Sequence, residues 1–447
     1  MTAFHSVRCF APFVAVASLA LAGTPAAAVD PDGDPILWWN QVFLDTLPFQ
    51  TNFQRPSASF NTAMHDAVNA ALGRPNYAYL KVPGAAGGDI RAAAAQAAHD
   101  TLLALRPAQA ALWSSSLATQ LALVPDGPSK DLGRATGASH AAAVLALRAN
   151  DGTGLPTPYT PSGLPGRWAP TPPAFAPAAN PWLADVTPWL TTGNDQFRPG
   201  PPPALDSAEY TAAFDEVKAL GAAIGSMRTA DQTNAAKFWS AATGPAIFFY
   251  NGINLAEAAG LSTIENAALF ARLHVAYADA EYQTFNSVFH YDHWRPVTAI
   301  RAADTDGNPA TVADPTWTSL AVAPPFPSYA APSIAIGSAI TNILEAKFGQ
   351  QTFCGTYAML TRCFASASDA LAESLESRIW GGTWFRFDGE AGLGIGEDIA
   401  AWTLAQKPFG AIPEPATWAM MIAGFGLVGG VARRRQREPK ALRQACA

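Results

Sequence analysis

The sequence predicts an all-α protein with two helical-bundle halves and, on the outside, an irregular segment rich in Pro and Gly. Hydrophobic residues make up 49% of the 447 residues and charged residues only 14%, which suits a folded chain with a large core. Ala-rich stretches with helical periodicity recur along the chain, whereas alternating strand patterns are nearly absent. Many of the 37 prolines fall in one middle stretch, between two groups of expected helices.

Residues 1–28 have the composition of a secretory signal peptide. Arg8 supplies a positive start, residues 10–22 form a short apolar run, and Ala26, Ala27 and Ala28 form a small-residue cleavage site. The alternative is a buried first helix, which would begin at the initiator Met without a cap. We therefore expect an exported protein.

The body of the chain divides into three regions by composition. Residues 29–150 form an N-terminal helical region, residues 151–206 a Pro/Gly-rich connection, and residues 207–410 a second helical region. The connection is too long for an ordinary loop, and we expect it to wrap the surface and to cover a pocket. Periodicity predicts helices at 57–72, 90–105, 108–123, 130–149, 207–226, 229–241, 253–286, 333–348, 366–380 and 395–406.

Two of the four cysteines lie in the body. Cys354 and Cys363 are nine positions apart. In an oxidising compartment they are expected to form a disulfide that closes a surface loop. The alternative is a pair of free buried thiols.

Some polar clusters suggest metal binding, although each has a simpler interpretation. His290 and His293 have the spacing His-x-x-His, but a role other than metal binding is favoured. Residues 304–308 resemble the start of a calcium loop but lack the Glu at its twelfth position, so a capped turn is favoured over a calcium-dependent adhesion module. His65, Asp66 and His274 are interpreted as core contacts, and no metal site is expected.

Residues 411–447 have the three parts of a sorting signal. Pro413-Glu414-Pro415 precedes an apolar run at 416–432 and an Arg-rich stretch at 433–437. This arrangement resembles the PEP-CTERM sorting signal of Gram-negative bacteria. The resemblance implies transient anchoring in the inner membrane and processing by an exosortase-type enzyme. The mature protein would then reside in the periplasm, at the cell surface or in the extracellular matrix; an ordinary C-terminal anchor is the alternative.

Three motifs carry a second resemblance. They lie at 288–301, 324–333 and 377–388, and they resemble the motifs of the vanadium-dependent haloperoxidases, which are relatives of the bacterial acid phosphatases and the type 2 phosphatidic acid phosphatases. The family pattern is Lys-x6-Arg-Pro, then Pro-Ser-Gly-His, then Ser-Arg-x3-Gly-x-His-x3-Asp. It implies an all-α fold and a pocket in which charge-assisted hydrogen bonds hold a tetrahedral oxyanion, with vanadate as the family cofactor.

Only part of this pattern is present. Arg295, Arg378, Gly382 and Asp388 stand at family positions and form an anion-binding remnant. Other family positions are substituted: Val288 stands at the Lys, Ala331 at the Ser, Pro332 at the Gly, Ser333 at the acid–base His and Trp384 at the vanadium-binding His. The indole nitrogen is a donor only and cannot ligate vanadium, so the cofactor lacks its ligand.

The sequence therefore predicts an exported haloperoxidase-like protein whose oxyanion site is degraded and which is catalytically inactive. The alternative is an active superfamily enzyme, haloperoxidase or phosphatase, with an anion site rebuilt around Arg295 and Arg378. A structural role is also open for these two arginines, through ion pairs with Asp388 or Asp292. Candidate partners are the exosortase-type enzyme and an extracellular polysaccharide or matrix. The net charge of −7 argues against nucleic acid.

Overall fold

The computed structural model describes residues 29–46, 52–83, 86–240, 244–357 and 360–411. These residues form thirteen α-helices and one β-hairpin, so the predicted all-α class is confirmed. The predicted signal peptide and most of the sorting segment lie outside the described residues. Along the described part of the chain, the helices are too short or too polar to cross a membrane.

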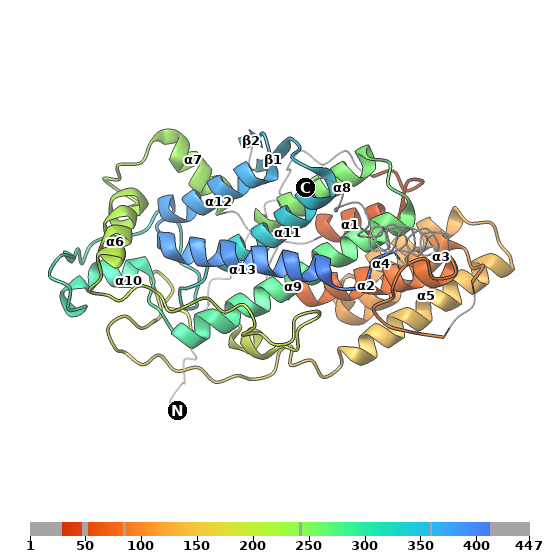
Figure 1. The fold of residues 1–447 in the computed structure, drawn as a ribbon, viewed down its shortest axis with the longest axis horizontal. Coiled ribbons are helices and arrows are strands. Elements are labelled where there is room, and N and C mark those ends of the chain that lie inside the picture. The colour runs from red at the N-terminus through yellow and green to blue at the C-terminus, as the bar shows by residue number, and fades with distance from the viewer. Residues whose placement is uncertain (1–28, 47–51, 84–85, 241–243, 358–359, 412–447) are drawn as a thin grey trace, which may run out of the picture.

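The N-terminal helices form one end of the elongated molecule (Figure 1). They are α1 (Pro35–Asp45), α2 (Gln54–Ala71), α3 (Ile90–Leu105), α4 (Ala110–Ala122) and α5 (Pro128–Leu147). Helix α2 is buried along almost its whole length. Helices α3 and α5 approach to backbone contact, because a Cβ atom at Gly137 would lie 2.4 Å from the carbonyl oxygen of Ala93. Small residues therefore set the close packing of this bundle.

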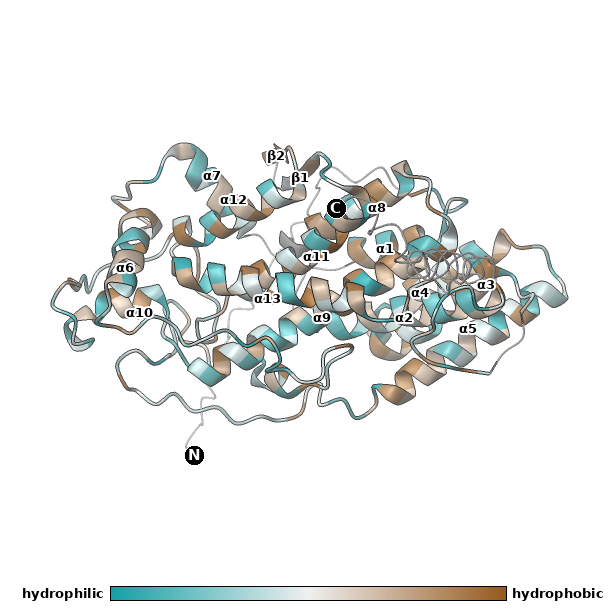
Figure 2. Cartoon of the chain, in the orientation of Figure 1, coloured by the Kyte–Doolittle hydropathy of each residue, from teal (hydrophilic) through white to brown (hydrophobic). Residues whose placement is uncertain are grey.

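The second group comprises α6 (Ala208–Gly221), α7 (Ala230–Trp239), α8 (Gly244–Ala258), α9 (Thr263–Tyr291), α10 (Pro296–Arg301), α11 (Pro332–Phe348), α12 (Ala367–Trp380) and α13 (Arg386–Ala405). The long helix α9 packs against α2 on one side and against α11 and α13 on the other, which joins the two groups. A Cβ atom at Gly396 would lie 2.3 Å from the carbonyl oxygen of Ala335, so α13 and α11 also meet at their backbones. Most helices mix hydrophobic and hydrophilic residues, as helices that bury one face do (Figure 2).

The Pro/Gly-rich connection runs over the outside of the helices, with one short 3₁₀ turn at Pro181–Asp185 (Figure 1). It is fastened to α9 by the buried carboxylate of Asp279. This side chain accepts hydrogen bonds from the backbone amides of Trp189, Leu190 and Thr191, at 2.6, 2.8 and 3.1 Å. The guanidinium of Arg148 also lies over the Trp189 ring, 4.4 Å from its centroid. The connection is thus ordered by buried polar contacts rather than by regular secondary structure.

One predicted helix was wrong in its extent, and two helices and a hairpin were missed. The helix expected at 253–286 is two helices, because the chain breaks at residues 259–262 and restarts with a capping box between Ser262 and Glu265. Helices α1 and α10 were not predicted. A hairpin of β1 (Phe353–Tyr357) and β2 (Leu360–Phe364) was also missed. Its paired residues Cys354 and Cys363 are joined by a disulfide.

The C-terminal end of the body returns to the N-terminal half. Asn76 and Ala411 form an antiparallel bridge. The Tyr77 amide donates to the carbonyl of Gly410, and the Phe409 amide donates to the carbonyl of Tyr77, both at 2.8 Å. The last described residues are therefore paired with the segment that follows α2.

Candidate functional site

Arg295 lies at the centre of the site, between α9 and α10. Helix α9 ends where Asp292 adopts a left-handed conformation, and Pro296 occupies the first turn of α10. This turn places the Arg295 side chain in the interior, where it is fully buried. Its Nε donates to the carbonyl of Phe326 at 2.8 Å and its Nη1 to the carbonyl of Thr383 at 3.1 Å. Two main-chain oxygens therefore hold the guanidinium.

Aromatic rings contact the same guanidinium. Its carbon lies 3.8 Å from the centroid of the Trp384 ring and 4.8 Å from that of Phe326. Trp384 is buried, with 3% of its surface exposed. A desolvated cation–π contact of this kind contributes about 2 kcal/mol or more. The indole that motif spacing aligns with the vanadium-binding His thus touches one of the two arginines expected to hold the oxyanion.

Both arginines retain unused donors. Nη2 of Arg295 and Nε of Arg378 are buried and have no hydrogen-bond partner among the described residues. Burial lowers the pKa of Arg295 to about 9 and that of Arg378 to about 10. The described residues provide no ion pair for either side chain, so the expected pairs with Asp388 or Asp292 are absent from that part of the chain. Asp292 instead accepts a short hydrogen bond from the hydroxyl of Tyr159.

Asp388 is fully buried near the start of α13. Its Oδ2 accepts a hydrogen bond from the hydroxyl of Ser328 at 2.5 Å and one from the amide of Phe385 at 2.7 Å. Its Oδ1 has no partner among the described residues. Burial raises the pKa of Asp388 to about 7, and the attraction of Arg295 opposes this shift. The carboxylate therefore caps α13 and fixes Ser328.

The second motif forms the start of α11. Ala331 is the N-cap residue and Pro332 occupies the first turn, where its missing N–H costs no helical hydrogen bond. Ser333 follows and is half-buried, with no side-chain hydrogen bond among the described residues. At the lysine position, Val288 is fully buried in α9. These four side chains add no charge, and only that of Ser333 carries a polar group.

Gly382 has a packing reason of its own. Its φ is +74°, and an added Cβ atom would lie 2.5 Å from the carbonyl oxygen of Gly221 at the end of α6. Only glycine fits that conformation and that contact. Its presence is therefore explained without an anion.

The histidines and the calcium-like loop show no metal arrangement. His293 is buried, with ring centroids of Phe385 and Phe387 at 5.7 and 5.6 Å, and burial lowers its pKa to about 3. His290 is exposed. Asp306 accepts hydrogen bonds from the Asn308 amide and the Thr311 hydroxyl, which makes the 304–308 segment a capped turn. Within the described ranges, no three His, Cys, Asp or Glu side chains gather as metal ligands would.

The remaining predicted core contacts also have defined partners. Nδ1 of His65 lies 2.9 Å from Oδ1 of Asp66, and both side chains are buried. His274 stacks on Phe249 with ring centroids 4.2 Å apart, and its Nε2 lies 3.0 Å from Oδ1 of Asn40. His65 and Asp66 are neighbours within α2, whereas His274 links α9 to α8 and to α1.

Sequence reasoning missed the carbonyl groups of Phe326 and Thr383 and the hydroxyl of Ser328. No residue type marks a main-chain carbonyl, so the first two had no signal. Ser328 did have one, because it stands within the second motif, in the stretch Pro324-Pro325-Phe326-Pro327-Ser328.

Comparison with known proteins agrees with the motifs. Residues 268–410 match the VCPO second helical-bundle domain, and residues 411–436 match the PEP-CTERM protein-sorting motif. The chain is also 25% identical over 199 residues to the vanadium chloroperoxidase of Curvularia inaequalis. That match covers 37% of this chain and 32% of the relative, so the matched stretch spans about a third of that protein.

Solved structures share the fold. The structure of the first bacterial vanadium-dependent iodoperoxidase has a TM-score of 0.65 and 21% identity, and the match covers 83% of this chain and 94% of that one. A bacterial vanadium-dependent chloroperoxidase matches in its apo form with a TM-score of 0.60 and 16% identity, over 77% and 92% of the two chains. Its holo form matches with a TM-score of 0.58 and 17% identity, over 85% and 93%.

The sorting motif implies export across the membrane in Gram-negative bacteria and is consistent with sorting by an exosortase-type enzyme. Residues 268–410 thus carry a domain of the VCPO second helical-bundle type, the chain has the helical fold of the vanadium haloperoxidases, and residues 411–436 carry a PEP-CTERM sorting motif.

Proposed function

We propose that this chain is an exported haloperoxidase-like protein that has lost the oxidative chemistry of its relatives and acts at the cell surface or in the matrix. The observation that carries the proposal is the contact between Arg295 and Trp384, 3.8 Å from guanidinium carbon to ring centroid. An indole occupies the place from which an imidazole would bind vanadium, and it covers one face of an anion-binding arginine.

The donors present do not fit vanadate. Such a trianion needs several converging cationic and neutral donors and one nitrogen ligand. Two guanidinium donors of Arg295 are already bonded to main-chain carbonyls. Val288 supplies no charge, and Pro332 supplies no N–H. All seven histidines of the chain precede the second and third motifs, and His293 is enclosed by aromatic rings.

The direct test is a peroxidase assay. The purified protein, supplied with orthovanadate, hydrogen peroxide and either bromide or iodide, is expected to show no halogenation above a protein-free blank. A phosphomonoester assay is expected to be silent as well. Titration followed by ⁵¹V NMR should give no bound vanadate signal. Turnover that disappears in Arg378→Ala would reject the proposal.

A second candidate is an active superfamily enzyme with an anion site rebuilt around Arg295 and Arg378, in which Ser333 or a nearby histidine takes part. The observation that favours it is the pair of buried, unpartnered atoms Nη2 of Arg295 and Nε of Arg378. A buried cation without an anionic partner is costly, and a bound anion would relieve that cost. Calorimetric titration with phosphate separates the candidates, since binding that Arg378→Ala abolishes supports the rebuilt site and no heat supports the first proposal.

The candidate partners follow from the expected location. We propose that an exosortase-type enzyme processes the chain near Pro413-Glu414-Pro415 and that the released body associates with an extracellular polysaccharide or other matrix. A variant in which this tripeptide is replaced by alanines should remain with the membrane fraction, whereas the parent protein should appear in the cell-surface or secreted fraction. Equal fractionation of the two proteins would argue against processing at this place.

A further inference from the structure

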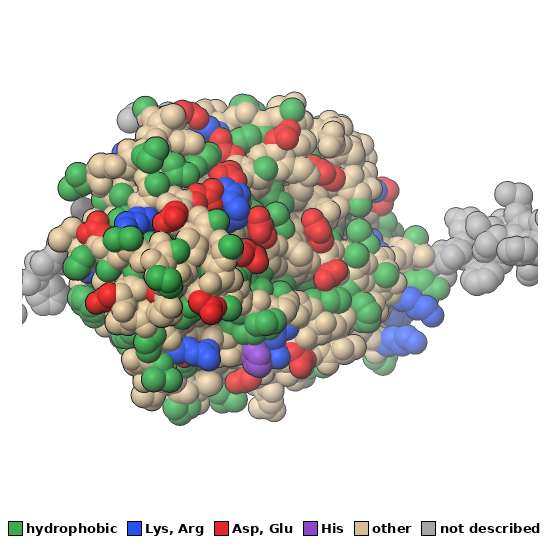
Figure 3. Space-filling view, turned by 60° about the vertical axis from the view of Figure 1, so that its left-hand side comes forward, with side chains coloured by type: hydrophobic (Ala, Val, Ile, Leu, Met, Phe, Trp, Pro, Cys, Tyr) green, Lys and Arg blue, Asp and Glu red, His purple; other side chains and the backbone are tan. Residues whose placement is uncertain are grey.

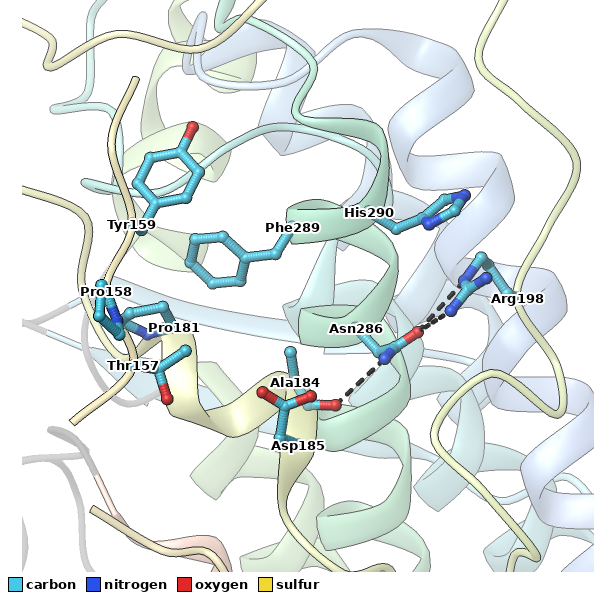
Figure 4. Close-up of a pocket in the computed structure, with 10 residues that line it drawn as sticks. All are labelled: Thr157, Pro158, Tyr159, Pro181, Ala184, Asp185, Arg198, Asn286, Phe289 and His290. Carbon is cyan, nitrogen blue, oxygen red and sulfur yellow. Dashed lines mark hydrogen bonds between the residues drawn. The ribbon is translucent and has the colours of Figure 1, made fainter. Parts of the chain in front are cut away.

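A cavity of about 270 Å³ lies between the Pro/Gly-rich connection and the C-terminal half of α9 (Figure 4). It is open to solvent and shares none of Arg295, Arg378 or Trp384 with the site described above. Binding pockets for drug-sized ligands measure roughly 300–1,000 Å³, so this one has room for about a single ring. The connection, which was expected to cover a pocket, thus lines one side of this surface cavity.

One side of the cavity is apolar. The rings of Tyr159, from the connection, and Phe289, from α9, meet edge to face with centroids 5.2 Å apart. Pro181 extends this wall. A tight hydrogen bond to Asp292 fixes the Tyr159 hydroxyl, so the wall is held in place. Rigid aromatic and proline faces of this kind pack against flat rings or the C–H face of a sugar.

The other side is polar and carries a cation that has no anionic partner. Nε and Nη2 of Arg198 donate to the side-chain oxygen of Asn286, at 3.1 and 2.5 Å. That partner is neutral, and the described residues offer Arg198 no carboxylate within ion-pair distance. His290 lies beside Arg198 at the same end of the cavity (Figure 4). This end is therefore suited to a carboxylate.

Another edge of the cavity carries a negatively charged side chain. Asp185 lies at the cavity with its carboxylate free of hydrogen bonds to other described side chains. An ionised carboxylate accepts hydrogen bonds only, so a ligand that reaches it must bring donors such as hydroxyl groups. An aromatic acid would satisfy Arg198 but would place bare hydrocarbon against Asp185. A ligand with one carboxylate, several hydroxyls and an apolar ring face satisfies both ends.

We infer that this cavity binds an acidic sugar unit, a uronic acid at or within an extracellular polysaccharide. Arg198 and His290 receive the carboxylate, Asp185 accepts hydroxyl donors, and the Tyr159–Phe289 wall packs against the ring. The face of the molecule seen in Figure 3 mixes acidic, basic and hydrophobic side chains rather than forming one basic field, which favours recognition of single acidic units over general adhesion to polyanions. The inference rests on the proposed matrix role and deepens it, because it names the chemical class of the matrix component.

Calorimetry with the purified protein and trigalacturonate tests the inference, with maltotriose as the neutral comparison and benzoate as the aromatic acid. Trigalacturonate is expected to bind at least about tenfold more tightly than either, as the loss of one charge-assisted contact implies. Arg198→Gln should weaken binding of trigalacturonate by about tenfold or more. Arg134→Gln is the matched control, because Arg134 also bonds to a neutral amide oxygen, that of Gln96. This variant should bind trigalacturonate as tightly as the parent protein does.

His290→Ala is a second variant at an exposed position, and it should weaken trigalacturonate binding without changing the thermal melting curve. Absence of binding in the parent protein, or unchanged binding in both Arg198→Gln and His290→Ala, would overturn the inference. Benzoate binding as tight as that of trigalacturonate would overturn the sugar assignment. Halogenation by the same preparation would defeat the proposed inactivity while leaving the binding result intact, so the two failures are distinguishable.

Discussion

The hydroxyl of Ser328 donates a hydrogen bond of 2.5 Å to Oδ2 of Asp388. In the family pattern this aspartate orients the acid–base histidine, whose position is taken here by Ser333. The carboxylate is buried, and it also caps α13 through the amide of Phe385. The contacts of Asp388 therefore give it a structural role in this fold.

This arrangement predicts a pH dependence. Burial raises the pKa of Asp388 from 3.8 to about 7, so the folded protein holds a proton that the unfolded chain has released between these values. The stability that Asp388 contributes is therefore present below about pH 4 and is lost as the pH rises towards 7. Urea unfolding from pH 4 to 8 should show a shallower decline with pH in Asp388→Asn than in the parent. The exposed Asp304→Asn variant should follow the parent, and superimposable curves for all three proteins would contradict the prediction.

Substitution of Gly382 should destabilise the fold. In Gly382→Ala the methyl group would meet the carbonyl oxygen of Gly221 at 2.5 Å and force a residue with a side chain to keep φ near +74°. We expect a loss of about 2 kcal/mol or more in the free energy of unfolding, measured by chemical denaturation. Gly394→Ala is the matched control, because a Cβ atom there meets nothing within 4 Å. It lies in helix α13 and should be neutral or stabilising by about 0.5–1 kcal/mol. A similar loss in both variants would speak against this explanation.

Removal of the Cys354–Cys363 disulfide should have a moderate effect. The bond closes a loop of nine residues in sequence separation. The chain-entropy relation gives about 2–3 kcal/mol for a loop of this length. The double variant Cys354→Ala, Cys363→Ala should unfold at correspondingly lower guanidinium concentration. Reductant should lower the unfolding midpoint of the parent protein towards that of the variant and leave the midpoint of the variant unchanged. An unchanged midpoint of the parent protein in reductant would rule out a stabilising disulfide.

Loss of the Asp279 carboxylate should release the Pro/Gly-rich connection. Asp279→Ala leaves the amides of Trp189, Leu190 and Thr191 without their acceptor, at a cost of about 3 kcal/mol or more. Hydrogen exchange at these amides should accelerate, and proteases should cut within 152–203 at lower concentration. Asp279→Asn keeps one acceptor oxygen, so its exchange rates and protease sensitivity should lie between those of the parent protein and Asp279→Ala. Unaltered exchange in Asp279→Ala would mean that other contacts hold the connection.

The sequence predicted the helices best where alanine and leucine set a clear period. The expected helix at 90–105 coincides with α3. Prediction from periodicity failed where a short break interrupts a longer apolar stretch, as at Gly260 and Ser262. Ser262 and Glu265 nevertheless have the spacing of a capping box. The hairpin escaped because its strands are only five residues long and one of them contains Gly355.

The candidate site was predictable in its residue types but not in its contacts. Motif spacing identified Arg295 and Trp384 as occupants of family positions. It gave no indication that the ring would lie against the guanidinium or that two carbonyl groups would bond to it, because such contacts depend on how distant loops meet in the fold. The alternative of ion pairs with Asp388 or Asp292 was chemically reasonable, yet backbone acceptors took that place.

The pairing of Asn76 with Ala411 has a consequence for maturation. Ala411 pairs with Asn76 and is also the first residue matched to the sorting motif. The hydrogen bonds of Gly410 and Phe409 lie on the N-terminal side of Pro413. A cut at or beyond that proline would therefore remove the tail and leave these hydrogen bonds intact. The released body would keep the hydrogen bonds between its C-terminal end and the segment that follows α2.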